Sequence, residues 1–353
     1  MILLPRDTTL ECVKFSGREA AVTCVTVCHN EAGIIDQFLE HYRSIGVGNF
    51  LVVDDRSTDG TTDILAAQPD VSLFRPTGGA QFKDNLGKWR QDLLDTYCSS
   101  AWVTLPDMDE FLYFNSMPAS LSALTVELEA EGSEALIAAM VDMYGDAPIK
   151  DQIYTGTAPL EEEFPFFDGV SEMPHGLRIV SQPTSFVRRF PTPSVAIKGG
   201  VRERIFFAPP RPSRIQKWMM TRWAHPRRPL NPTWLEKKQN ALLRALTQAK
   251  TPAPPFVLNK FALLKWPRGA KFSRAPHSLD RVVKVSERLA VFLHFKFYKG
   301  VQAFNYNVER GQHAGGSVHY RKILEQADAL ERNPVYSGSR RFEGLHSLDG
   351  LLR

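Results

Sequence analysis

Residues 102–112 read WVTLPDMDEFL, an apolar run followed at once by two acidic residues. The run WVTL is short and rich in strand-forming residues, as expected for a buried β-strand. In an extended chain, side chains two positions apart point the same way, so Asp107 and Asp109 converge. Converging carboxylates repel unless a cation lies between them, and oxygen ligands suit Mg²⁺ or Mn²⁺. The stretch predicts a metal site at a strand end, although Asp-x-Asp alone also fits a solvated turn.

Two more polar clusters follow apolar runs earlier in the chain. Residues 25–31 read VTVCHNE and end in Glu31, and residues 51–61 read LVVDDRSTDGT and carry Asp54 and Asp55. In open α/β sheets, ligands bind beyond the carboxyl ends of the strands. Asp54 and Asp55 are therefore placed to accept hydrogen bonds from a ribose hydroxyl or a base N–H. A capped turn is the alternative explanation for this Asp-rich stretch.

Strand and helix patterns alternate through residues 1–150. The predicted strands cover residues 21–28, 50–55, 71–74, 102–105 and 135–143, and the predicted helices include residues 34–45, 84–97 and 118–131. This alternation predicts an α/β fold with a doubly wound, mostly parallel, Rossmann-like sheet. Neither GxGxxG nor GxxxxGK[ST] spacing occurs, which argues against a dinucleotide dehydrogenase and a P-loop NTPase.

The composition of the sequence changes after residue 146. Of the 24 prolines, 18 lie between Pro148 and Pro276, so we expect short elements and many loops that cover the sheet. Further on, residues 289–297 predict a late strand and residues 317–331 a helix.

Charge is distributed unevenly along the chain. Residues 1–150 hold 10 Lys and Arg against 23 Asp and Glu, whereas residues 178–274 hold 21 basic residues and only Glu203 and Glu236 as acids. A basic second half suits phosphates, an anionic acceptor or an anionic membrane surface, and it also fits an ordinary solvated face. No apolar run is long enough for a spanning helix, and the N-terminus lacks a secretory pattern. We expect a cytoplasmic protein, with any membrane contact peripheral.

Together, the three motifs resemble family-2-type glycosyltransferases of the GT-A fold. The resemblance is closer to a bacterial family-2-like branch related to family-92 glycosyltransferases, in residues 107–112, 141–144, 166–168, 260–266, 293–297 and 310–313. It implies one GT-A domain. Residues 1–150 would form its nucleotide-sugar-binding half, and residues 151–353 its acceptor-binding and sheet-completing half, with the proline-rich, basic region as acceptor region.

The resemblance also implies roles for the acidic residues. Asp54 and Asp55 would contact the nucleoside, and Glu31 would lie beside the nucleotide. Asp107 and Asp109 would form the pair that holds the metal and the diphosphate.

Three residues outside these motifs are further candidates. In many GT-A enzymes a late histidine completes the metal shell, and His294 is the match here, with a structural strand histidine as the alternative. The Glu-Asp motif that holds the base of inverting relatives is missing. Asp142 and Asp168 are the candidates left to deprotonate an acceptor hydroxyl.

The predicted function is metal-dependent transfer of a sugar from a nucleotide-diphosphate sugar, with a UDP-sugar favoured. The acceptor would be a glycan or glycolipid such as lipopolysaccharide or capsule, and no nucleic-acid partner is expected. One alternative is a sugar-phosphate nucleotidylyltransferase, which would want a Gly-rich, Lys- or Arg-bearing loop after the first strand. The other is a non-catalytic basic module that binds glycan or lipid, which leaves the acidic strand ends unexplained.

Overall fold

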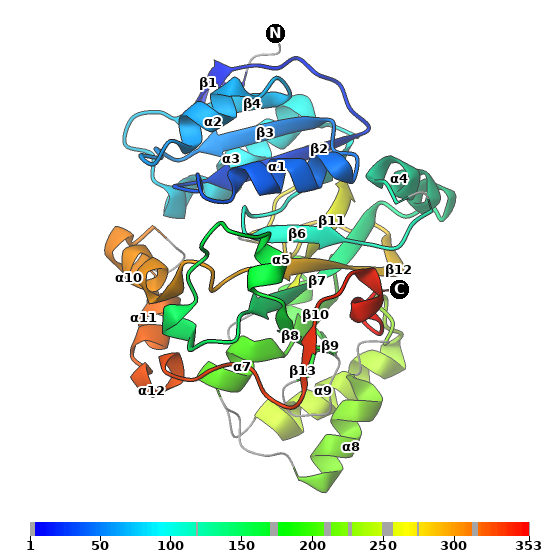
Figure 1. The fold of residues 1–353 in the computed structure, drawn as a ribbon. Helices are drawn as coiled ribbons and strands as arrows, with labels where there is room; N and C mark the ends of the chain where they lie inside the picture. The colour runs from blue at the N-terminus through cyan, green and yellow to red at the C-terminus, as the bar shows by residue number, and fades with distance from the viewer. Residues whose placement is uncertain are drawn as a thin grey trace.

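An 11-stranded β-sheet runs through the computed structural model (Figure 1). The structure describes residues 4–117, 119–169, 176–207, 213–224, 228–248, 257–273, 275–312 and 317–352. The strands lie in the order β1–β4–β3–β2–β5–β11–β7–β12–β6, and β8 and β13 extend the sheet from β7. Their bounds are β1 Leu10–Lys14, β2 Val22–Cys28, β3 Asn49–Asp54, β4 Val71–Pro76, β5 Trp102–Thr104, β6 Glu110–Tyr113, β7 Ala135–Tyr144, β8 Phe166–Asp168, β11 Asn259–Lys265, β12 Val285–His294 and β13 Ser339–Arg341.

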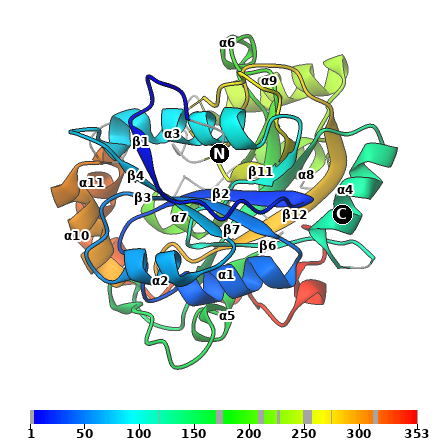
Figure 2. The ribbon, with the colours of Figure 1, turned by 90° about the horizontal axis from the view of Figure 1, so that it is seen from above.

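Helices cover both faces of the sheet. They are α1 Ile35–Ser44, α2 Thr61–Ala67, α3 Phe82–Tyr97, α4 Leu121–Ala130, α5 Leu160–Glu163, α6 Thr184–Val187, α7 Gly200–Phe206, α8 Arg214–Trp223, α9 Trp234–Gln248, α10 Gly300–Arg310, α11 Val318–Leu324 and α12 Ala327–Leu330. Seen from above, α3 lies on one face of the N-terminal strands, and α1 and α2 lie on the other (Figure 2). The predicted α/β class with helices on both faces is confirmed.

The apolar spacing of α1 explains why this helix packs on the sheet. Ile35, Phe38, Leu39 and Tyr42 recur at helical spacing and are fully buried. Gly46 follows with φ of +100°, a conformation that glycine adopts without strain, and it ends the helix.

The parallel part of the sheet is its N-terminal side. The neighbours β4, β3, β2 and β5 pair in parallel, as do β7 and β12, whereas β1, β11 and β6 pair antiparallel with their neighbours. The central sheet thus has the expected parallel strands on its N-terminal side and in the pair β7–β12, and the antiparallel strands β1, β11 and β6 make the complete sheet mixed. Only residues 105–109 separate β5 from β6, too few for a parallel crossover, which takes a dozen or more.

The second half of the chain contributes more to the sheet than expected. Strands β11 and β12 lie inside the sheet, between β5 and β6. β12 is the late strand that residues 289–297 predicted, whereas β11 comes from the proline-rich region, which was expected only to cover the sheet. The late strand ends at His294, not at residue 297, and the predicted helix over residues 317–331 breaks into α11 and α12.

The part of the proline-rich region between β8 and β11 lies outside the main sheet. It contains α8, α9 and a two-stranded sheet of β9 Arg178–Ser181 and β10 Val195–Lys198. Part of the region predicted to hold short elements and loops, residues 208–212, 225–227 and 249–256, lies outside the described residues. No helix in the described part of the chain is long and apolar enough to cross a membrane.

Trp266 and Trp234 form a matched pair for testing the packing. Trp266 is fully buried and its indole N–H donates to Asp95 over 2.7 Å, whereas Trp234 is 72% exposed. We expect Trp266→Ala to lower the free energy of unfolding by about 3–5 kcal/mol, because a cavity forms in the core. Trp234→Ala should change it by less than about 0.5 kcal/mol. Urea unfolding of both variants checks this, and equal losses would contradict the packing described.

Candidate active site

Strand register brings together three predicted residues that lie far apart in the sequence. His294, the last residue of β12, is paired with Glu110 at the start of β6, next to Asp109. On its other side β12 runs parallel to β7, and the register places His294 opposite Asp142. His294 Nε2 lies 3.4 Å from Asp109 Oδ2, and its Nδ1 lies 2.6 Å from Asp142 Oδ1. The three side chains form a row in which the imidazole bridges two carboxylates.

The row is held together by charge. Burial alone would lower the pKa of His294, but Asp109 and Asp142 outweigh this effect and raise the pKa to about 9. Burial also opposes ionisation of Asp109, yet the nearby charges of His294 and Lys296 hold the pKa of Asp109 well below its usual range. In this arrangement, therefore, His294 is a charged imidazole that donates to both Asp109 and Asp142.

Asp142 is buried and both of its oxygens have partners. Its side chain is 1% exposed, one oxygen accepts from His294, and the other accepts from Arg202 Nε over 2.7 Å. Burial raises its pKa, but Arg202 and His294 outweigh this and lower the pKa to about 2. With both oxygens occupied, Asp142 orients His294 and does not suit the role of base predicted for it.

Asp107 belongs to a second charged cluster. Its oxygens lie 2.6 Å from Arg90 Nη2 and 2.9 Å from Lys260 Nζ, and its side chain is 47% exposed. Lys260 is fully buried and lies 2.6 Å from Glu110 Oε2, which also accepts from the backbone N–H of Asp107. The local burial of the carboxylate opposes ionisation of Asp107, but Lys260 and Arg90 lower its pKa far below its usual range. Two buried cations thus fix the first acid of the motif at the surface.

Glu31 meets residues from the far end of the chain. Its Oε2 lies 2.7 Å from Lys299 Nζ and accepts from the hydroxyl of Tyr298. Burial raises the pKa of Glu31 despite these partners, and the charge of Asp109 adds to the rise. The segment after β12 contacts both places, because the backbone N–H of Phe295 donates to Asp109 and Tyr298 donates to Glu31, so the end of β2 lies near the turn before β6.

Asp54 holds the turn that follows β3. Its oxygens accept from the backbone N–H of Ser57, over 3.0 Å, and from the hydroxyl of Thr62. The capped turn that the sequence left as an alternative is therefore present at Asp54.

Asp55 meets a helix from the C-terminal part of the chain. It is 1% exposed and pairs with Arg56 and with Arg310 at the end of α10. One helical turn earlier, the hydroxyl of Tyr306 lies 2.5 Å from Nε2 of His29. Helix α10 therefore lies over the ends of β2 and β3, where nucleoside contacts were predicted.

Sequence reasoning missed most of the cations at this site. Arg90, Lys260 and Lys296 face the acidic motif, and Lys299 and Arg310 face the first two strand ends. The available signal was weak. Lys260, Lys296 and Arg310 lie within segments that carry the family resemblance, and His313 of the last segment lies outside the described residues.

Asp168 lies in a different environment. Its two oxygens lie 2.9 Å from Arg204 Nε and Nη2, and the hydroxyl of Tyr144 donates to it over 2.6 Å. Its side chain is only 2% exposed. This buried pair fastens β8 to α7, and the role of Asp168 as base stays a prediction.

Of the three predicted metal ligands, the structure brings only Asp109 and His294 together. Within the described ranges, no three His, Cys, Asp or Glu side chains come close enough together to hold a metal ion. Asp109 and His294 are neighbours, and the contact of His294 Nδ1 with Asp142 is the orientation that metal-binding histidines commonly have. A divalent cation with Asp109 and His294 as its two protein ligands would have to replace the proton on His294 Nε2, while Asp107 is turned to Arg90 and Lys260.

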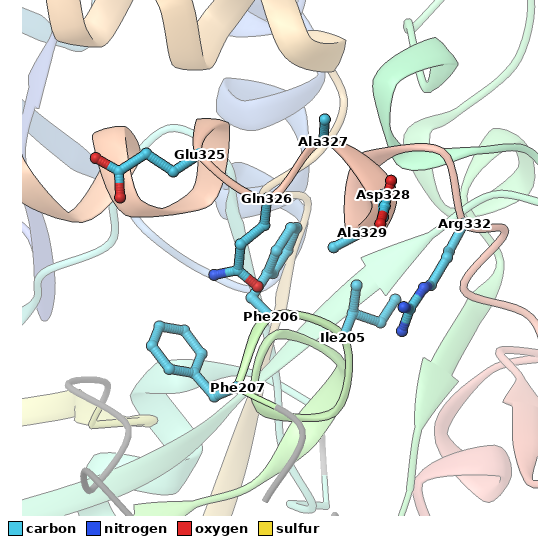
Figure 3. A pocket seen from close by; sticks show the side chains of 9 residues that line it. All are labelled: Ile205, Phe206, Phe207, Glu325, Gln326, Ala327, Asp328, Ala329 and Arg332. Atoms are coloured by element: carbon cyan, nitrogen blue, oxygen red, sulfur yellow. The ribbon is translucent and has the colours of Figure 1, made fainter.

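A cavity of about 500 Å³ lies apart from these strand ends (Figure 3). Its walls come from α7 and the α11–α12 segment, and they carry Phe206, Phe207, Gln326 and Arg332 among other side chains. None of the predicted site residues lines it, so the cavity is separate from the candidate active site.

Comparisons with known proteins give weak similarities. No family model and no curated protein matches the chain. Among solved structures, a mannosyltransferase from Pyrobaculum calidifontis in complex with GDP-Man and Mn²⁺ is 16% identical, with a TM-score of 0.25 and 40% of each chain covered. A 4-diphosphocytidyl-2C-methyl-D-erythritol synthase is also 16% identical at a TM-score of 0.25, covering 37% of this chain and 64% of that one.

A third similar structure covers more of the chain. It is a protein assigned as a glucose-1-phosphate thymidylyltransferase from Bacillus anthracis, in complex with sucrose, at 9% identity and a TM-score of 0.25. It covers 68% of this chain and 89% of its own length. The chain thus spans less than two thirds of the first two structures. At these TM-scores the likeness carries no argument, so the assignment depends on the residues of the site.

Lys260 offers a test of the charged cluster. We expect Lys260→Met to lower the free energy of unfolding by about 3–5 kcal/mol, because Glu110 is then buried without its cation. The double variant Lys260→Met, Glu110→Gln should lose clearly less, since the unpaired charge is gone. Urea unfolding measures both, and a double variant no more stable than the single one would contradict the pairing.

Proposed function

We propose that this protein is a glycosyltransferase that uses a nucleotide-diphosphate sugar, with a UDP-sugar favoured, and a glycan or glycolipid acceptor such as lipopolysaccharide or capsule. The observation that carries the proposal is the row Asp142–His294–Asp109 beside the strand-end acids Glu31 and Asp55. Ligands of open α/β sheets bind at this edge, which supports placing the donor there.

The site offers cations as well as acids for a charged donor. Lys299 Nζ contacts both Glu31 and the backbone carbonyl of Asn30, and its side chain is 37% exposed. Arg310 is 18% exposed beside Asp55. We assign Lys299 and Arg310 to the phosphates of the donor, because Lys and Arg bind phosphate oxygens through charge-assisted hydrogen bonds.

In this proposal Asp109 and His294 hold Mn²⁺ or Mg²⁺, with Asp142 fixing the imidazole. The bound metal would offset the charge that develops on the leaving diphosphate. Asp107, held by Arg90 and Lys260, then orients the donor from the opposite side of the motif.

The nucleotidylyltransferase alternative lacks its main feature. Residues 29–33 contain one glycine and neither Lys nor Arg, and the side chain of their one acid, Glu31, is 18% exposed. Such a loop does not suit the triphosphate that this reaction takes as substrate.

A screen of UDP-, GDP- and dTDP-sugars with Mn²⁺ tests the proposal by release of the nucleoside diphosphate. Pyrophosphate release from a nucleoside triphosphate and a sugar phosphate would support the alternative.

Asp109 is the first residue to test. Asp109→Asn should lower donor hydrolysis and transfer by about a hundredfold or more, since a metal ligand and its charge are lost. Glu40→Gln, an exposed change on α1, is the control and should be neutral. Release of nucleoside diphosphate measures both. Wild-type activity above about a tenth of normal after EDTA treatment would contradict the metal role.

His294 separates metal binding from donor binding. His294→Gln should raise the Mn²⁺ concentration for half-maximal activity by about tenfold or more, while UDP still binds. Activity measured against Mn²⁺ concentration, together with calorimetric titration of UDP, checks both statements. A Mn²⁺ curve that overlays that of the wild type would make His294 a structural histidine.

Arg310 tests the assignment of α10. Arg310→Ala should raise KM for the donor by about tenfold, with a smaller change in kcat, because a phosphate contact made in the ground state is lost. Lys322→Ala, an exposed change on the neighbouring α11, is the matched control. An unchanged KM would remove Arg310 from the donor site.

A further inference from the structure

Helices α8 and α9 expose an unusual number of large apolar side chains. The exposed fractions are 72% for Ile215, 61% for Trp218, 72% for Trp234, 58% for Leu235, 51% for Leu242 and 47% for Leu246. The two helices pack against each other, so these six side chains belong to one helical pair, here called the α8–α9 face. The surfaces of soluble proteins rarely expose so many large apolar side chains close together unless a partner binds there.

Helical spacing explains how the two helices can be both packed and exposed. On α8, Ile215, Trp218 and Arg222 share one side, whereas Met219 is buried in a small core with Leu243 of α9. The inner sides thus join the helices to each other. The outer sides carry apolar residues beside cations, as in helices that lie in a membrane interface.

The outer side of α9 repeats this pattern. Trp234, Lys238, Leu242 and Leu246 recur every four residues, so they share one stripe. Lys238 Nζ lies 5.5 Å from the centre of the Trp234 ring, which places a cation directly beside an exposed aromatic side chain.

The helical pair is strongly basic. Residues 213–224 and 228–248 hold seven basic residues and one acid: Arg214, Lys217, Arg222, Arg228, Lys237, Lys238, Arg244 and Glu236. Glu236 is itself engaged, because it pairs with Arg228 at 2.9 Å and accepts from the backbone N–H of Thr233. The face therefore offers apolar groups and net positive charge together.

The position of the pair leaves it accessible. In Figure 1, α8 and α9 lie at the end of the molecule opposite α1, α2 and α3, and in Figure 2 they lie toward one side of the sheet. The strand-end site and the α8–α9 face are thus built from different elements.

We propose that the α8–α9 face binds the surface of an anionic lipid bilayer. Trp218, Trp234 and the neighbouring Leu and Ile side chains would insert at the level of the headgroups, where Trp is favoured. Lys237 and Lys238 would meet the negative headgroups, an attraction that weakens with salt. The proposal does not depend on the proposed transferase function, although it suits a glycolipid acceptor.

The combination of groups favours a bilayer over other partners. A nucleic acid would use the cations but leave most of the apolar stripe in water, since its backbone is charged throughout. A second copy of the same helical pair would bring a net charge of about +6 against +6, because one of the seven cations is offset by Glu236, and the two copies would repel. Anionic lipid satisfies both the apolar and the charged groups.

Co-sedimentation of the full chain with vesicles tests the proposal. The vesicles are phosphatidylcholine alone, or phosphatidylcholine with phosphatidylglycerol, each at low and high salt. Binding is expected to the anionic vesicles only, with a partition coefficient that falls by about tenfold or more at high salt.

Two sets of variants separate apolar from charged contributions. The double changes Trp218→Ser with Trp234→Ser, and Lys237→Glu with Lys238→Glu, should each lower binding by about tenfold or more. The controls are Val126→Ser with Val282→Ser, which are 67% and 80% exposed elsewhere, and Arg18→Glu with Lys271→Glu, an equal change in net charge. Circular dichroism confirms that each variant is folded.

Each outcome decides the proposal. Equal binding to neutral and anionic vesicles, or loss of binding in the controls as large as in the α8–α9 variants, would overturn it. Self-association without vesicles that disappears in the tryptophan variant, with no vesicle binding, would identify the face as an interface between copies and also overturn it. Donor hydrolysis in solution is a separate measurement, so failure of the transferase proposal leaves the membrane result unaffected.

Discussion

Charge compensation inside the sheet is the constraint on which the rest of this structure depends. Asp107, Glu110, Asp109 and Asp142 crowd around the ends of β6, β7 and β12, and ionised carboxylates in such a place are strongly unfavourable unless they are paired. Lys260 lies between the first two, and the other two are bridged by the imidazole of His294. These cations allow the ionised side chains of Glu110 and Asp142 to be buried beside the partly exposed Asp107 and Asp109.

This compensation joins the two halves of the chain. The acids come mainly from residues before 150, and their cations come mainly from strands and helices that follow, such as β11 with Lys260 and α7 with Arg202. The acidic first half and basic second half of the sequence are therefore complementary within the fold. A site made in this way requires β11 and β12 inside the sheet, which is where the structure places them.

The same pairing explains part of the positive charge of residues 178–274. Of its cations, Arg178, Arg202, Arg204 and Lys260 are engaged with partly or fully buried acids. These residues account for part of the excess without any external partner. Six of the remaining basic residues belong to α8 and α9, which also expose tryptophan and leucine side chains: Arg214, Lys217, Arg222, Lys237, Lys238 and Arg244.

The sequence by itself determined the elements whose signals are local. The N-terminal strands with polar ends and the helices between them follow from apolar spacing, and so did the position of Asp107 and Asp109 at a strand end. Only the tertiary structure decided that His294 lies against Asp109, that the oxygens of Asp168 are engaged, and that Trp266 is buried while Trp234 is exposed. These depend on strand register and packing between distant segments, and no short stretch of sequence contains that information.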